Sequence, residues 1–154
     1  MKIKMIGLCV AVILMAAAVC SADNPHMGTW KLNEAKSKFA AGATKNHTVV
    51  YEAAGDETKV TVDGTDASGG AVHNEWTGKF DGKYSAVNGS PTSNVRAYRV
   101  INTRTLSIRE KQNGKVVLTG TIMVSRNGKM RTVTTTARDA KGKWIHNTAV
   151  YDKQ

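Results

Sequence analysis

Arginine and tyrosine side chains that could bind an anionic group recur through the middle and the C-terminal part of this sequence. They are Arg96, Tyr98, Arg99, Arg109, Arg131 and Tyr151. In extended strands Arg96 and Tyr98 share one face, and Arg131 shares a face with Val133. If these faces point inward, guanidinium and phenol groups could hold an anionic amphiphile by charge-assisted hydrogen bonds. If they point outward, the arginines face water and their aliphatic stems lie on the sheet. The alternation of residues along a strand does not show which face is inside, and we favour the outward orientation.

Aromatic side chains are the better candidates for an apolar pocket wall, namely Trp76, Phe80, Tyr98 and Tyr151. Trp76 and Phe80 are predicted to pair across Gly78. The same rings could equally form an ordinary barrel core. The candidate ligand-binding set that follows from both groups is Trp76, Phe80, Arg96, Tyr98, Arg131 and Tyr151.

Residues typical of catalysis or metal binding do not fall into a recognisable pattern. The histidines His26, His47, His73 and His146 show no ligand spacing, and most Asp residues sit in predicted turns. Nucleophile-elbow, zinc-protease and phosphate-loop motifs are absent from the sequence. We therefore expect no catalytic residue, no metal site, no cofactor and no enzymatic activity.

The N-terminal segment 1–22 has the composition of a signal peptide. Lys2 and Lys4 precede a nearly continuous apolar run, and Cys20-Ser21-Ala22 supplies small residues before a cut ahead of Asp23. Both cysteines, Cys9 and Cys20, lie in this segment, so a mature chain starting at Asp23 contains no thiol. We predict a secreted or periplasmic protein; lipid attachment at Cys20 is the less favoured alternative, because Val19 precedes it.

Turn signals recur about every 10 to 15 residues, which is the rhythm of antiparallel sandwiches and barrels. They include Asp63-Gly64, Asp81-Gly82, Asn88-Gly89, Asn113-Gly114, Asn127-Gly128 and Lys141-Gly142. The runs between them are rich in Val, Thr, Ile and Tyr, which suit strands. We predict an all-β fold, an antiparallel up-and-down barrel of eight to ten strands, forming a single domain over 23–154. Segment 33–44 is predicted to be a loop with one helical turn, draped over one barrel end.

Positive charge is spread along the whole chain and is not gathered in one run. The formal net charge of +10 falls to +8 if a leader with Lys2 and Lys4 is removed. Many of the lysines sit in predicted turns, where they keep the surface soluble. We expect a monomer that does not bind nucleic acid, and the sequence carries no later stretch apolar enough for a transmembrane segment.

Two terminal motifs resemble those of a known superfamily. Gly28-Thr29-Trp30-Lys31-Leu32 is similar to the opening of the calycins, which comprise the lipocalins and the fatty-acid-binding proteins, and Val150-Tyr151 resembles the end of the latter. The opening Gly-Thr-Trp-Lys-Leu-Asn resembles more closely a group of small exported bacterial proteins without an assigned activity. The resemblance implies a lipocalin-like barrel with Trp30 packed at its closed end.

The chain departs from the fatty-acid-binding pattern in two places. The arginine that usually stands two residues before the terminal tyrosine is replaced by Ala149, and segment 33–44 is too short for the two-helix lid. A carboxylate site copied from that family is therefore not expected.

Two kinds of function remain for an exported barrel of this size. The first is a binding module that holds a small hydrophobic or anionic amphipathic ligand in its lumen, without chemistry. The alternative is a periplasmic or secreted interaction protein, an inhibitor or envelope-associated factor, with a filled barrel and working loops. Small inward residues such as Thr132, Thr134, Thr136 and Ala149 would leave room for a cavity and favour the first.

Overall fold

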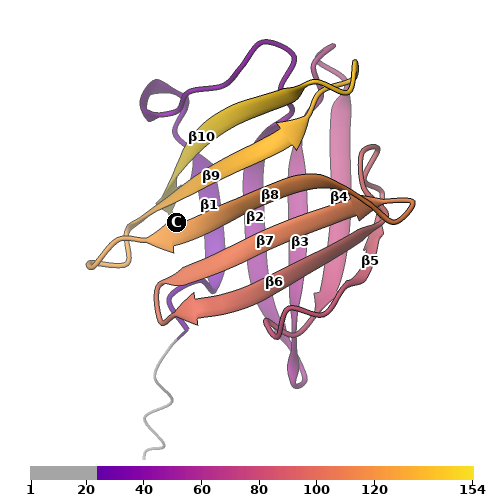
Figure 1. The fold of residues 1–154 in the computed structure, drawn as a ribbon. Helices are drawn as coiled ribbons and strands as arrows, with labels where there is room; N and C mark the ends of the chain where they lie inside the picture. The colour runs from indigo at the N-terminus through magenta and orange to yellow at the C-terminus, as the bar shows by residue number, and fades with distance from the viewer. Residues whose placement is uncertain (1–23) are drawn as a thin grey trace, which may run out of the picture.

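Ten strands and one short 3-10 helix make up the part of the chain that the computed structural model describes, residues 24–154 (Figure 1). The elements are β1 (Gly28–Leu32), η1 (Glu34–Lys36), β2 (Lys45–Ala54), β3 (Glu57–Thr65), β4 (Ala71–Gly78), β5 (Ser85–Asn88), β6 (Val95–Asn102), β7 (Thr105–Gln112), β8 (Lys115–Val124), β9 (Met130–Arg138) and β10 (Trp144–Lys153). The predicted signal peptide lies outside the described residues.

Every strand pairs antiparallel with its neighbours in sequence, and β1 pairs with both β2 and β10, so the sheet closes on itself. The all-β, up-and-down barrel predicted from the turn rhythm is confirmed, with a strand number at the upper end of the expected range. Closure pairs every sheet edge and removes the exposed strand that an open meander would leave.

Most turns form where the sequence predicts them. The prediction was wrong for Asp63-Gly64, which lies within β3 opposite a bulge in β2, and the chain turns at 66–70 instead. Between β7 and β8, Asn113 and Gly114 both adopt positive φ angles, of 49° and 80°. A tight hairpin turn needs this left-handed backbone, and Asn and Gly are the residues that adopt it most readily. The local turn chemistry therefore specifies which strands are neighbours.

Segment 33–44 covers one end of the barrel, as predicted. The side chain of Asn33 accepts a hydrogen bond from the Lys36 backbone and caps the single turn η1. Lys38 forms a bridge with Thr148 on β10, and the partly buried ring of Phe39 packs against the core. In Figure 1 this segment, drawn in indigo, lies at the same end as the turn between β9 and β10.

No helix in the described part of the chain combines the length and apolar character that crossing a membrane requires.

Candidate functional site

Aromatic rings fill the half of the barrel that contains the start of β1 and the ends of β4 and β6. Trp76 stacks on Phe80 with ring centres 6.3 Å apart, and Tyr98 meets Trp76 edge-on at 4.8 Å. Tyr51 approaches Tyr98 at 6.2 Å. A Cβ on Gly78 would lie 2.7 Å from the Trp76 ring, so the glycine makes room for the predicted pairing of Trp76 with Phe80. These rings form packed core at the closed end of the barrel.

Arg131 and Trp30 form the base of this closed half. Trp30 is fully buried, and its indole N–H donates to the carbonyl oxygen of His26 at 2.9 Å. The Arg131 guanidinium, 2% exposed, lies 5.1 Å from the ring of Trp30, 5.0 Å from Tyr51 and 4.7 Å from Tyr151. Its Nε and Nη1 find no hydrogen-bond partner among residues 24–154, so contact with ring faces is the main compensation for its burial.

Burial shifts the pKa values of the titratable groups in the closed half. It lowers the pKa of His26 to about 4, with the nearby positive charges of Arg131 and Lys153 adding to the effect. Burial also raises the pKa of the Tyr98 hydroxyl and raises that of Tyr151 to about 12, although Arg131 opposes the latter shift. The histidine and both phenols are consequently neutral at pH 7.

The other half of the barrel is hollow. A cavity of about 310 Å³ opens among the loop 39–44, the turns near 66 and 91, and the turn after β9. Its walls are largely apolar, with side chains such as Phe39, Val72, Leu118, Val133, Ala137, Ile145 and Ala149. This volume lies at the lower end of the range of small-molecule sites, which are typically about 300–1,000 Å³.

A charged pair lines one side of the cavity, where β4, β6 and β7 contribute inward residues. The Nε of Arg96 donates to a carboxylate oxygen of Glu110 at 2.5 Å, and its Nη2 donates to the amide oxygen of Asn74 at 3.1 Å. Arg96 is 5% and Glu110 6% exposed. Burial is the largest single influence and lowers the pKa of Arg96. The charge of Glu110 and the hydrogen bond to it, together with the nearby Tyr98 and Tyr51, outweigh burial, so the net shift is upward. Arg96 therefore remains a cation.

The Arg96 backbone joins the two halves of the barrel. Its carbonyl oxygen accepts a hydrogen bond from the Trp76 indole at 2.9 Å. The polar pair therefore sits directly beside the aromatic core, and this hydrogen bond helps to hold it in position. Arg96 Nη1 is buried and has no partner among residues 24–154.

Charged side chains also stand at the cavity mouth. Asp66 accepts bonds from the backbone N–H groups of Ser68 and Gly70 and from the Ser68 hydroxyl, whose bond is the largest cause of the lowered pKa of that carboxyl. Asp139 accepts backbone N–H bonds within its own turn, and Arg138 lies over the ring of Trp144. Together with the Arg96–Glu110 pair, the charged lining comprises two cations and three carboxylates.

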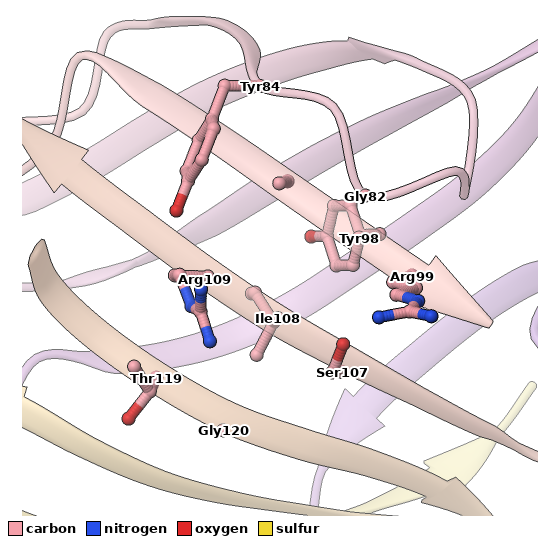
Figure 2. A pocket seen from close by; sticks show the side chains of 10 residues that line it. Gly82, Tyr84, Tyr98, Arg99, Ser107, Ile108, Arg109, Thr119 and Gly120 are labelled. Carbon is pink, nitrogen blue, oxygen red and sulfur yellow. The ribbon is translucent and has the colours of Figure 1, made fainter. Parts of the chain in front are cut away.

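A second hollow of about 230 Å³ lies in the barrel wall, between segment 82–84 and strands β6 to β8 (Figure 2). Arg99 and Arg109 are exposed there, on either side of Ser107 in the view. The Tyr84 hydroxyl is buried without a partner among the described residues. None of the ten lining residues is acidic, so this groove is basic. The cavity inside the barrel, in contrast, has more carboxylates than cations in its lining.

The histidines outside the core are dispersed over separate strands. His47 contacts Thr65, His73 contacts Asp63 at 2.6 Å, and His146 contacts Thr136. Within residues 24–154, no group of three or more His, Cys, Asp or Glu side chains is arranged to hold a metal ion.

The six residues predicted to bind a ligand all point into the barrel, but only Arg96 and Tyr151 line the cavity. Trp76, Phe80, Tyr98 and Arg131 pack in the closed half, where bulky side chains contact one another and fill the interior. The favoured outward orientation was wrong for Arg96 and Arg131, which are buried, and holds for Arg99 and Arg109. Ligand contact by any of these residues stays a prediction.

Glu110 and Asn74 line the cavity and were not among the residues predicted from the sequence. Glu110 has the same strand parity as Leu106 and Ile108, so a carboxylate on an otherwise apolar face was a readable signal. Its register partner across β6 and β7 is Arg96, and that pairing is visible only once the hairpin is aligned.

Comparison with solved structures places the barrel in a known fold type. The chain is similar to a Schistosoma mansoni fatty acid binding protein in complex with arachidonic acid, with a TM-score of 0.53, 15% identity, and coverage of 84% of this chain and 96% of that one. It is also similar to EF1p2_mFAP2b bound to DFHBI, with a TM-score of 0.51, 11% identity, and coverage of 84% and 94%. The fold is thus a closed antiparallel barrel like that of the fatty acid binding protein.

Neither a protein-family model nor a curated protein sequence matches this chain. At such low identity the structural likeness establishes the fold alone.

Proposed function

We propose that this protein binds one small hydrophobic or amphipathic molecule in the open half of its barrel and carries it without chemical change. The observation that carries the proposal is the cavity of about 310 Å³, with apolar walls and a polar group on one side. A barrel filled to both ends, as the alternative of a loop-based interaction protein implies, would not leave this space. The ligands held by barrels of the same fold support the proposal by analogy.

The cavity lining also favours binding without chemistry. The titratable groups deep in the cavity are Arg96, Glu110 and Tyr151. Arg96 and Tyr151 both have raised pKa values, so neither exchanges a proton readily near pH 7. Glu110 is engaged by Arg96.

A pair of neighbouring threonines on β9 provides a matched test. Thr135 lines the cavity, whereas Thr134 is exposed on the opposite face of the same strand, which Thr132 and Thr136 share. The expectation that these three outward threonines make room inside the barrel was therefore wrong, because Val133, Thr135 and Ala137 form the inward face. We expect Thr135→Trp to fill the cavity and abolish uptake of a neutral fluorescent probe such as N-phenyl-1-naphthylamine. Thr134→Trp should bind as the unmodified protein does.

Probe titration together with a thermal melt of each variant checks this expectation. Equal uptake by the two folded variants would place binding outside the lumen and contradict the proposal. Native mass spectrometry of the protein from its own source would add the identity of the bound molecule.

We further propose export, on the strength of the leader composition of residues 1–22. The expected mature N-terminus is Asp23. Intact-mass measurement distinguishes it from a chain that begins with a lipid-modified Cys20, and a chain that retains Met1 would refute export by cleavage.

A further inference from the structure

The charged pair inside the cavity determines which polar end a ligand can present. We propose that the lumen selects an uncharged amphiphile, one whose head both donates and accepts hydrogen bonds, over a carboxylate of the same chain length. Alcohols, primary amides and glycerol esters have such heads. This inference rests on the proposed lumen binding and adds the chemical class of the ligand.

The Arg96–Glu110 pair carries no net charge. Arg96 is the cation deep in the cavity wall, and Glu110 already neutralises it at 2.5 Å. A carboxylate arriving at Arg96 would come close to the Glu110 carboxylate, and the two paired side chains are only 5% and 6% exposed. Like charges at close range in such surroundings repel strongly, and a net negative charge would remain buried. An uncharged head leaves the pair balanced.

The pair also leaves hydrogen-bonding capacity unused. Arg96 lines the cavity, and its Nη1 is buried without a partner among residues 24–154, so one donor of this guanidinium is unsatisfied. Among residues 24–154, Glu110 accepts a side-chain hydrogen bond through one of its two carboxylate oxygens, which leaves the other as an acceptor. A hydroxyl or amide satisfies both kinds of group, whereas a carboxylate can only accept. A buried donor left unsatisfied is costly, which gives a complementary head its advantage.

The remaining cations do not attract an anionic head either. Arg131, the other buried guanidinium on an inward face, lies under the rings of Trp30, Tyr51 and Tyr151 and does not line the cavity. Arg138 at the mouth is outnumbered by Asp66 and Asp139. The cavity is therefore slightly negative within a chain of net charge +10, and its lining does not attract anions.

A ligand series with one tail and different heads tests the proposal. Decanol, decanamide and sodium decanoate would each be titrated at pH 7.5 against the purified protein loaded with N-phenyl-1-naphthylamine. We expect the alcohol and the amide to displace the probe at least about tenfold more tightly than the carboxylate, a factor that corresponds to ~1.4 kcal/mol.

Glu110→Gln should largely abolish this preference, because it leaves Arg96 free to pair with the ligand. We expect decanoate to gain about tenfold in affinity, with decanol changing far less, as for loss of one like-charge repulsion. Glu52→Gln, which removes an exposed carboxylate and changes the net charge equally, is the matched control and should leave the series unchanged.

The outcomes distinguish failure of the head-group selection from failure of lumen binding. Equal or tighter binding of decanoate by the unmodified protein would overturn the head-group selection and leave lumen binding intact. Failure of the probe and of all three ligands to bind would overturn the proposed function, and the selection with it. The comparison on the unmodified protein decides the matter even if Glu110→Gln does not fold.

Discussion

The two halves of this barrel are made by the same ten strands and are packed in opposite ways. In the closed half, Trp30, Trp76 and Tyr98 fill the interior, with relative exposures of 0–2%. In the open half, smaller inward side chains such as Val133, Thr135, Ala137 and Ala149 leave a cavity. The difference shows that one half stabilises the sheet and the other provides space, so a substitution's effect should depend on its half more than on its strand.

The largest expected effect is the loss of the ring at the base of the closed half. Trp30→Ala should lower the free energy of unfolding by roughly 3–5 kcal/mol, as for a large buried aromatic side chain. Trp144→Ala is the matched control, because that ring is 39% exposed and lies over Arg138 at the barrel mouth. Urea denaturation of both variants measures the difference, and equal midpoints would contradict the division into two halves.

The buried pair at the boundary of the halves should behave as a unit. Glu110→Leu alone leaves a buried, uncompensated guanidinium and should cost roughly 3–5 kcal/mol of stability. The double variant Arg96→Met with Glu110→Leu removes both charges and should recover most of that loss. A double-mutant cycle on unfolding free energies gives the coupling, and strictly additive costs would show that the pair is not buried as a unit.

The closed half should also weaken in acid. The folded-state pKa of His26 is about 4, below the ordinary 6.5, because the ring is buried near Arg131 and Lys153. Between these values the unfolded chain binds the proton and the folded chain does not, so stability falls as pH drops from 6.5 towards 4. The loss from this group is at most about 3 kcal/mol, at ~1.4 kcal/mol per unit.

Denaturation midpoints of the unmodified protein and of His26→Gln, measured from pH 7 to pH 4, check this dependence. In the variant, the denaturation midpoint should fall less steeply with pH, because the contribution of His26 is removed. An identical slope in both proteins would assign the acid sensitivity to other groups.

The smallest expected effect is in the open half. Ala137→Ser adds one hydroxyl to the cavity wall, where it can be hydrated, and should change the unfolding free energy by no more than about 0.5 kcal/mol. A serine in the closed half, Val124→Ser at 1% exposure, buries a hydroxyl and also removes two packed methyl groups, so it should cost several times more. Similar costs at both sites would mean that the open half is packed as tightly as the closed one.

Part of the candidate site could be predicted from the sequence. The parity of Arg96 with Tyr98, and of Arg131 with Val133, correctly grouped residues that share the inner face. Parity could not separate pocket from core. Trp76, Phe80, Tyr98 and Arg131 pack in the closed half, and their contact with a ligand stays a prediction. Glu110 was overlooked because its significance depends on Arg96, which opposes it across two strands.

The sequence by itself determined the meander, because Asn-Gly and Asp-Gly turns set which strands are neighbours and alternation sorts each strand into two faces. Alternation does not say which face loses contact with water. Only closure of the barrel decided that, by bringing β1 against β10 and burying one face of every strand. The cavity, and the pairing of Arg96 with Glu110 beside it, depend on side-chain volumes summed across strands distant in sequence, so the tertiary structure alone decided them.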